Sequence, residues 1–475
     1  MNIYLPIEVK ARELEGKMLL ALEAAGRGHT VVIGKKQDTL NLAKAGNLPP
    51  GIVHDKSLTP GEYKIRNFEQ LKQHGHVITA QDEESGLLDE SFDKFAKQRF
   101  SEDTISLTDQ VFAWGDHDAS SLKKIYPEYA DRIVKTGSPR VDFWRTEFAP
   151  YFSIEKERRK PFLLVASNFG FPIDENPFWN KVARLRGAGY FDRDPEMEQF
   201  MYENSAYQYR LLYYFIEAVR KLSADFPEMD ILVRPHPVES IDAWNKLMGD
   251  YSNVFIERKG TISRLIRNSF LLMHNGCTSA LEASVSKTPR VAYRPIPHAI
   301  EREIPNETSI HAFSYPELKD TIQSYFDGNL SEKMEDVAQK TNQIISGRLA
   351  NTSGRFAAEE IVDQWEKLQT TNELPESDHQ ELLRIYREVS KKRKRKQMIQ
   401  GLKVKAVNFR NLFTGQKRDQ PNRGNLLKTS HKFPYLNMGE VTEIKMNIRK
   451  ATGKYGEIST VQFGENSYIL FKNKT

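Results

Sequence analysis

The sequence lacks the features that mark several whole classes of protein. It contains one cysteine, Cys277, in 475 residues, which excludes an internal disulfide and a metal site built from clustered cysteines. No run of eighteen or more apolar residues is present, and residues 1–6 lack the charged and apolar regions of a secretory signal. We therefore expect a protein that is made and kept in the cytoplasm.

Several catalytic fingerprints are also missing. The absence of Gly-x-Gly-x-x-Gly argues against a nicotinamide or flavin enzyme, and the absence of Gly-x-x-x-x-Gly-Lys-Ser/Thr excludes a P-loop. There is no Gly-x-Ser-x-Gly elbow and no His-x-x-x-His or His-Glu-x-x-His pair. We predict neither a bound cofactor nor a metal site.

What the sequence does contain is typical of a globular protein with more than one domain. Hydrophobic residues make up 39% and charged residues 28%, and the net charge of +5 is modest for this length. The length allows two domains with cores and an appendage. We predict an N-terminal, acceptor-side domain at residues 1–150, a C-terminal, nucleotide-sugar-binding domain at 151–372 and a basic C-terminal extension at 373–475.

Short apolar runs alternate with helix-length stretches through both predicted domains, which indicates an α/β fold with parallel sheets. The predicted strands are residues 2–6, 30–34, 51–54, 76–80, 110–114, 133–136, 162–166, 231–233, 270–273 and 290–293. The predicted helices are 12–25, 197–223, 316–326, 331–345 and 355–368. Residues 171–196 and 304–309, rich in Pro, Asn, Asp, Glu or Gly, are predicted as loops.

Polar residues follow three of the strands in the second domain, where a parallel sheet binds its ligand. These residues are Asn168, then Arg234, His236 and Pro237, then Asn275, Gly276, Thr278, Ser279 and Glu282. Backbone N–H groups and hydroxyls at a helix start, together with a cation, suit a phosphate. Two prolines fix the backbone on either side of His236, and Glu282 is placed to accept hydrogen bonds from a ribose. The alternative is that these residues only end strands and cap a helix.

Three consecutive carboxylates, Asp82, Glu83 and Glu84, leave a strand end in the first domain. Crowding of partly buried carboxylates raises at least one pKa, as a general base near neutral pH requires. Acidic runs in loops are usually only solvated, so the catalytic interpretation depends on other residues.

Seven short segments form a further pattern: residues 6–13, 34–35, 82–84, 137–142, 167–170, 234–237 and 274–278. Together they resemble bacterial surface-carbohydrate biosynthesis proteins of the GT-B glycosyltransferase type, closest to those related to CMP-Kdo transferases and bacterial sialyltransferases. The resemblance covers roughly residues 1–368 and implies two Rossmann-like domains facing a cleft.

The resemblance also implies roles for residues at the matching positions. An acidic pair before glycine supplies the base, here Glu83 and Glu84 with Asp82 beside them; Ser85 precedes Gly86, which leaves open which carboxylate is the base. His236-Pro237 corresponds to the His-Pro motif that contacts the donor phosphate, and Thr278-Ser279 to the Ser/Thr pair at the helix start.

The resulting hypothesis is a metal-independent, inverting glycosyltransferase. It moves a sugar, preferably Kdo or a related ulosonic acid, from a CMP-activated donor to a surface polysaccharide or a lipid-linked acceptor. One alternative is a transferase of glycerol- or ribitol-phosphate from a CDP-linked donor. Another is a non-catalytic scaffold of the same fold that binds carbohydrate or membrane.

The basic excess is concentrated near residues 391–418, beginning with six consecutive Lys and Arg residues. Leu, Val and Phe interleave with the basic residues that follow, as in a segment held at the anionic inner leaflet of the cytoplasmic membrane. A solvated extension is the alternative. No nucleic-acid-binding fold is evident, so we expect no nucleic-acid partner.

Overall fold

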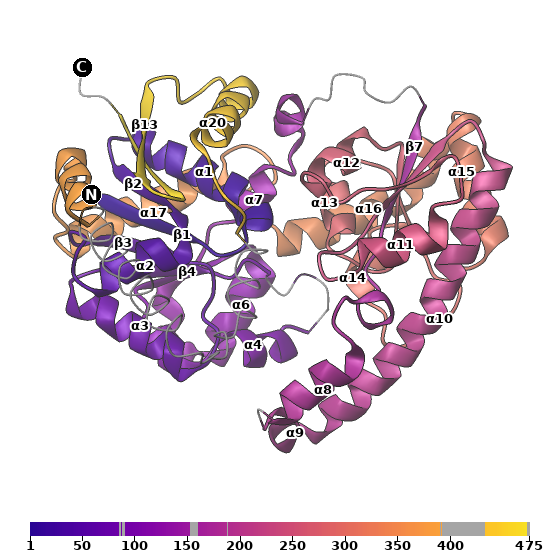
Figure 1. Cartoon of the computed structure of the whole chain (residues 1–475), viewed down its shortest axis with the longest axis horizontal. Coiled ribbons are helices and arrows are strands. Elements are labelled where there is room, and N and C mark those ends of the chain that lie inside the picture. The colour runs from indigo at the N-terminus through magenta and orange to yellow at the C-terminus, as the bar shows by residue number, and fades with distance from the viewer. Residues whose placement is uncertain are drawn as a thin grey trace, which may run out of the picture. The chain divides into compact units, whose positions relative to one another are not determined.

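The structure is a computed structural model that describes residues 1–84, 87, 91–152, 160–187, 189–389, 391 and 433–472. The chain divides into two compact units (Figure 1). Unit 1 comprises Met1–Ser85, Asp93–Phe143 and Ala350–Thr475, and unit 2 comprises Gly86–Phe92 and Trp144–Leu349. This division differs from the predicted domains because residues 350–372 and the end of the chain return to the first unit.

Unit 1 contains one eight-stranded sheet in the order β13-β14-β2-β1-β3-β4-β5-β6. The strands are β1 (Asn2–Ile7), β2 (Thr30–Lys35), β3 (Gly51–Asp55), β4 (Val77–Gln81), β5 (Gln110–Ala113), β6 (Ile133–Lys135), β13 (Ile458–Gly464) and β14 (Ser467–Lys472). Strands β1 to β6 are parallel, and every residue of β1 is buried. Because β2 and β3 pair with opposite edges of β1, the strand order reverses there, and ligands of such sheets bind beside the reversal at the carboxyl ends.

Helices of unit 1 include α1 (Lys10–Gly26), α2 (Lys36–Lys44), α3 (Glu62–Gln73), α4 (Asp93–Arg99), α5 (Glu102–Ser106), α6 (Asp116–Ile125), α7 (Pro139–Asp142), α17 (Ala357–Thr371) and α20 (Met438–Thr452), and residues 379–389 are helical as well. Helix α1 packs against α7, α17 and α20. At the contact with α7, a Cβ on Gly16 would lie 3.1 Å from the Arg140 backbone nitrogen, so glycine allows the close approach.

Two long-range interactions explain why the end of the chain belongs to unit 1. The buried carboxylate of Asp142 accepts hydrogen bonds from the backbone nitrogens of Ala357 at 2.9 Å and Ala358 at 3.1 Å, which satisfies the start of α17. Strand β14 pairs antiparallel with β2, with Ile469 opposite Val32. The predicted basic extension is therefore not a single appendage, since its last part completes this sheet.

Unit 2 contains a six-stranded sheet in the order β12-β11-β10-β7-β8-β9, and all its strands are parallel. The strands are β7 (Phe162–Ala166), β8 (Asp230–Arg234), β9 (Val254–Ile256), β10 (Leu271–His274), β11 (Arg290–Tyr293) and β12 (Ile310–Ala312). This is the doubly wound Rossmann order, with its reversal between β7 and β10. The two sheets confirm the predicted α/β class with Rossmann-like domains.

The α-helices of unit 2 are α8 (Phe178–Gly187), α9 (Tyr190–Arg193), α10 (Pro195–Asp225), α11 (Ile241–Met248), α12 (Ile262–Asn268), α13 (Ser279–Val285), α14 (Glu303–Glu307), α15 (Tyr315–Phe326) and α16 (Leu330–Arg348). Figure 1 shows α8 and α9 beside the first turns of α10. Short 3-10 helices lie at Pro127–Arg132 in unit 1 and at Thr146–Tyr151 and Phe171–Ile173 in unit 2.

Two loop predictions were wrong. Most of residues 171–196 is helical because α8, α9 and α10 bury Val182, Phe191 and Met201 in a small core of their own. Residues 304–309 contain most of α14, in which Ile304 is buried. In both places the frequent Pro, Gly and acidic residues concealed a few apolar side chains that pack together.

Within the described ranges, no helix combines the length and hydropathy needed to span a membrane. The basic segment proposed for the membrane surface lies outside the described residues, apart from Lys391.

Candidate functional site

In unit 2, the predicted binding residues follow three adjacent strands, β8, β7 and β10, at one edge of the sheet. Asn275, after β10, donates from Nδ2 to the backbone oxygen of Asn168, after β7, at 3.1 Å. The other amide atom, Oδ1 of Asn275, is buried and has no hydrogen-bond partner within the described part of the chain. The strand-order reversal therefore carries a buried acceptor without a partner among the described residues, which is uncommon in folded proteins.

His236 lies on the exposed turn after β8. Its Nδ1 accepts a hydrogen bond from the backbone nitrogen of Val238 at 3.4 Å, which places the proton of a neutral ring on Nε2. The backbone nitrogen of His236 donates to Ser167 Oγ at 3.3 Å and to Glu239 Oε2 at 3.2 Å. This tautomer makes Nε2 a donor suited to a phosphate oxygen.

Arg234 has another use in the structure. Its guanidinium donates to the backbone oxygens of Glu257, Lys259 and Gly260, at 3.3, 3.0 and 2.6 Å. Burial lowers the pKa of Arg234 to about 10. The side chain holds the turn after β9, so its predicted role as the phosphate cation stays a prediction with a competing structural role.

The turn into α13 contains the predicted Ser/Thr pair. Gly276 has φ +81°, and a Cβ there would lie 3.2 Å from Cβ of Arg302, so the turn requires glycine. The Thr278 side chain does not cap α13, and no hydrogen bond to its hydroxyl is present among the described residues. Helix capping, the alternative for Thr278, is therefore not its role here, whereas Ser279 beside it is buried.

Two further residues of this segment are buried. Glu282 has only 3% of its surface exposed, which does not suit the predicted contact with a ribose. Cys277 packs in the core between β7, β8 and α12, and burial raises the pKa of its thiol, as expected for a packing residue rather than a nucleophile.

In unit 1, charged side chains crowd the carboxyl ends of β1, β2 and β3. Glu8, after β1, forms ion pairs with Lys36 at 3.4 Å and Lys56 at 3.2 Å. Asp55, at the end of β3, pairs with Lys64 at 2.7 Å. These side chains lie at the strand-order reversal, and Glu8 belongs to segment 6–13 of the resemblance.

The three predicted carboxylates follow β4 at the same edge but differ in their surroundings. Asp82 is buried and forms a two-point ion pair with Arg99. Glu84 is exposed and pairs with Arg12 at 2.7 Å. Burial alone would raise the pKa of Glu84, but the nearby Arg12 and Arg99 lower it below its usual value. Burial outweighs Arg99 at Asp82, whose pKa is raised.

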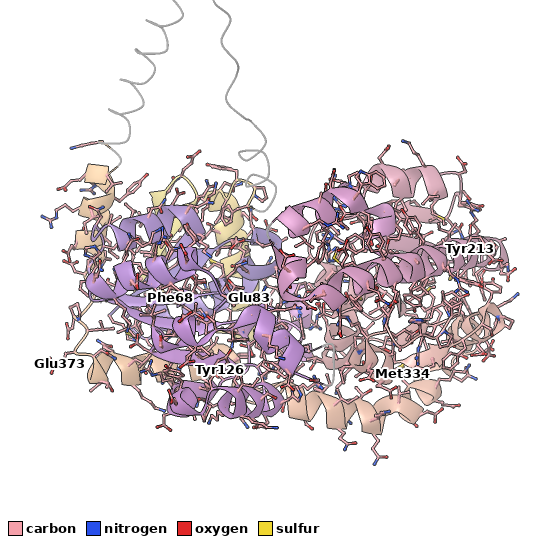
Figure 2. The ribbon with its side chains drawn as sticks, turned by 90° about the horizontal axis from the view of Figure 1, so that it is seen from below. Phe68, Glu83, Tyr126, Tyr213, Met334 and Glu373 are labelled. Carbon is pink, nitrogen blue, oxygen red and sulfur yellow. The ribbon has the colours of Figure 1, made fainter. Side chains whose placement is uncertain are left out.

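Glu83, which is labelled in Figure 2, differs from its two acidic neighbours in its contacts. Its side chain is partly buried, and among the described residues none forms a hydrogen bond or ion pair with its carboxylate. Burial raises its pKa to about 7, with Lys17, Arg140 and Arg12 acting in the opposite direction and Glu13 in the same one. A pKa near neutrality suits a general base.

The backbone around Glu83 is fixed by Arg140, which lies in segment 137–142 of the resemblance, and by Lys56 and Trp114, which were not predicted as site residues. Arg140 donates to the Glu83 backbone oxygen at 3.2 Å, and Glu83 N donates to the Lys56 backbone oxygen at 3.1 Å. Trp114 Nε1 donates to the Asp82 backbone oxygen at 2.8 Å. These contacts join residues that are 27 to 57 positions apart in the sequence, which gave no signal of them.

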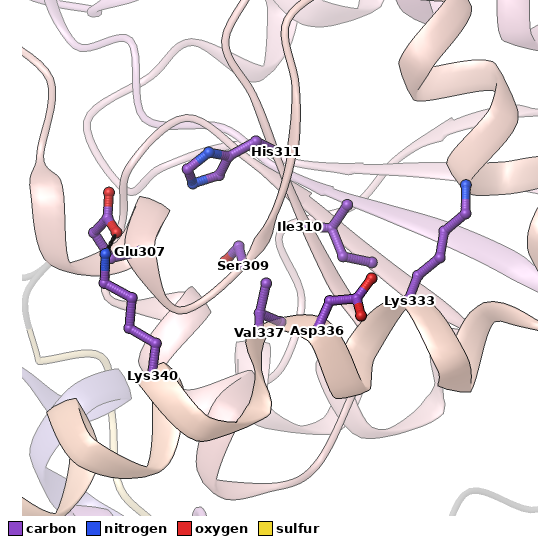
Figure 3. A pocket seen from close by; sticks show the side chains of 8 residues that line it. All are labelled: Glu307, Ser309, Ile310, His311, Lys333, Asp336, Val337 and Lys340. Atoms are coloured by element: carbon purple, nitrogen blue, oxygen red, sulfur yellow. Dashed lines mark hydrogen bonds and ion pairs between the residues drawn. The ribbon is translucent and has the colours of Figure 1, made fainter.

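A cavity of about 450 Å³ lies elsewhere in unit 2, between the segment leading into β12 and helix α16 (Figure 3). Its lining side chains are Glu307, Ser309, Ile310, His311, Lys333, Asp336, Val337 and Lys340. None of them was predicted as a site residue. Glu307 and Lys340 form an ion pair at one side of it.

Over the described part of the chain, no group of three or more His, Cys, Asp or Glu side chains is arranged to hold a metal ion. The metal-independent reaction stays a prediction.

No protein-family model matches the sequence, and no curated protein matches it. Solved structures similar to this chain include the S. aureus MnaA-UDP co-structure, with 12% identity, TM-score 0.44 and coverage of 79% of this chain and 97% of that one. UDP-GlcNAc 2-epimerase from Neisseria meningitidis bound to UDP-GlcNAc has 12% identity, TM-score 0.44 and coverage of 78% and 100%. The wall teichoic acid polymerase TagF has 11% identity, TM-score 0.48 and coverage of 78% and 88%.

Proposed function

We propose that this protein transfers a glycosyl group from a nucleotide-activated donor to an acceptor hydroxyl during synthesis of a bacterial surface glycan. Unit 2 binds the donor and unit 1 supplies the base, which we assign to Glu83. The observation that carries this proposal is the contrast within the acidic group. Asp82 and Glu84 are held by arginines, whereas the Glu83 carboxylate has a pKa of about 7.

In the proposed reaction, the acceptor oxygen attacks the anomeric carbon while Glu83 takes the hydroxyl proton. The bond between that carbon and the donor phosphate breaks, and its electron pair leaves with the phosphate. Nε2–H of His236 and the hydroxyl of Thr278 donate hydrogen bonds to the phosphate as its charge develops. Attack opposite the leaving group inverts the anomeric configuration.

For the donor we propose a CMP-linked ulosonic acid, with Kdo as the first candidate. The resemblance of the His-Pro and Ser/Thr segments to CMP-sugar transferases supports this choice. The proposed acceptor is a polysaccharide or lipid-linked sugar. The inner-leaflet contact of the basic C-terminal segment is proposed from its sequence alone.

Turnover measured with CMP-Kdo, CMP-sialic acid, UDP-sugars and CDP-glycerol tests the proposal. Release of CMP from CMP-Kdo in the presence of an acceptor, abolished by Glu83→Gln, is the expected result. Preference for CDP-glycerol would instead identify the phosphate-unit transferase. If no donor is turned over and calorimetry detects no binding of CMP, CDP or UDP, the alternative of a non-catalytic scaffold would be favoured.

A further inference from the structure

Glu239 is a carboxylate with no exposed surface, three residues after His236 on the same turn. The chemistry proposed above makes no use of it. A carboxylate this deeply buried is costly to keep in a protein unless its oxygens are satisfied by hydrogen bonds. The donors around Glu239 therefore indicate what it does.

Four neutral groups donate to this carboxylate. Oε2 accepts from Ser167 Oγ at 2.5 Å, from the His236 backbone nitrogen at 3.2 Å and from Trp244 Nε1 at 3.0 Å. Oε1 accepts from the Phe169 backbone nitrogen at 2.7 Å. The carboxylate thus joins the turn after β7, the turn after β8 and helix α11.

Both turns carry candidate donor-binding residues. Asn168 lies on the turn after β7, between Ser167 and Phe169, and His236 lies on the turn after β8. A second side chain, Arg258, also holds the turn after β8. It donates hydrogen bonds to the backbone oxygens of His236, at 3.3 Å, and of Glu239. The backbone at His236 is therefore fixed from two sides, and the imidazole extends from a backbone of defined position.

We propose that Glu239 is a positioning residue, whose carboxylate sets the backbone of His236 so that the imidazole meets the donor phosphate. The proposal rests on the proposed function of His236. The competing explanation is that Glu239 only stabilises the core of unit 2. Both explanations expect a lower stability when Glu239 is changed, but only positioning expects its effect on catalysis to depend on His236.

The test is a double-mutant cycle on the full chain. Glu239→Gln preserves the shape but places an amide N–H against at least one of the four donors. We expect kcat to fall about 10- to 100-fold with KM within about threefold, because a displaced contact weakens the transition state. In the His236→Ala background, the same change is expected to lower kcat by no more than about twofold further.

Glu228→Gln is the control. Glu228 is an exposed carboxylate of the same unit, on the loop before β8. Removing its charge is expected to leave kcat within about twofold. A Glu239→Gln protein that is folded and retains wild-type kcat would overturn the inference. The inference would also be overturned if Glu239→Gln lowered kcat by the same factor in the wild type and in the His236→Ala background.

Ser167→Ala serves if Glu239→Gln does not fold, since it removes the hydroxyl that links Glu239 to the His236 backbone. It is expected to show the same dependence on His236. A readout independent of activity is the 15N NMR spectrum of the His236 ring, which should show the Nε2–H tautomer in the wild type and a mixture in either variant. An unchanged spectrum in both variants contradicts the inference, whereas failure of all donors to react contradicts only the proposed function.

Discussion

Arg99 donates to both carboxylate oxygens of Asp82, from Nε to Oδ2 at 2.9 Å and from Nη2 to Oδ1 at 3.0 Å. This two-point ion pair gives the Asp82 side chain a structural role, which supports the assignment of Glu83 as the base. Replacing Glu83 by Gln is expected to lower kcat about 10³-fold with the fold intact, since general bases contribute about 10²- to 10⁴-fold. The check is single-turnover kinetics with the donor identified by the substrate panel.

Glu84→Gln is the matched control for that experiment, because Glu84 is the exposed neighbour that pairs with Arg12. Its loss is expected to cost less than about 10-fold in kcat, as for an exposed ion pair. A larger loss from Glu84→Gln than from Glu83→Gln would move the base to Glu84.

The raised pKa of Glu83 predicts the pH dependence of the reaction. The carboxylate form is the active base, and burial raises its pKa to about 7. The value of kcat/KM should therefore rise about tenfold per pH unit below 7 and level off above it. A profile already flat at pH 5 would show that the essential base has an ordinary carboxyl pKa and is not Glu83.

The tautomer of His236 predicts which substitutions it tolerates. Nδ1 accepts from Val238, so the group offered to the phosphate is Nε2–H. His236→Ala should lower kcat at least about 100-fold without unfolding the protein. His236→Gln, whose amide nitrogen can occupy the place of Nε2, should retain more activity than His236→Asn, whose amide corresponds to Nδ1. The reverse order would show that Nδ1 contacts the donor.

The sequence predicted the strand ends that carry the candidate site residues, because the signals of a strand end are local. Strand ends are visible as changes from apolar to polar residues, and the residues after β4, β7, β8 and β10 were all predicted from such changes. The register of a parallel sheet then brings the ends of neighbouring strands to one edge without further information.

What the sequence did not reveal depends on contacts between distant segments. Nothing near Glu239 in the sequence shows that Ser167 and Phe169 donate to it, about 70 residues away. The base could not be chosen among three carboxylates because Arg99 and Arg12 reach them through the fold. For the same reason, the sequence did not show that the Arg234 side chain holds the turn after β9.

Asp142 gives a stability prediction for the return of the chain to unit 1. Its buried carboxylate accepts two backbone N–H groups at the start of α17. Asp142→Ala should reduce the free energy of unfolding by about 2–3 kcal/mol, since it removes a capping interaction and leaves buried donors unsatisfied. Urea denaturation followed by tryptophan fluorescence measures the change. Asp131→Ala, at an exposed aspartate of the same unit, is expected to change it by less than about 0.5 kcal/mol.

The pairing of β14 with β2 predicts how the basic C-terminal segment must be tested. Ile469 and Leu470 are fully buried in the sheet of unit 1, and α20 packs against α1. Deleting residues 433–475 should therefore expose the edge of β2 and a large apolar surface, and yield insoluble protein. A soluble, folded 1–432 protein would contradict this structural role.

Replacing the six basic residues 391–396 by Gln leaves the hairpin of β13 and β14 in place and should preserve the fold. If the segment binds the inner leaflet, this replacement should weaken binding to phosphatidylglycerol vesicles at low salt, because each basic residue near an anionic surface contributes about 1 kcal/mol. Unchanged vesicle binding would contradict the membrane proposal.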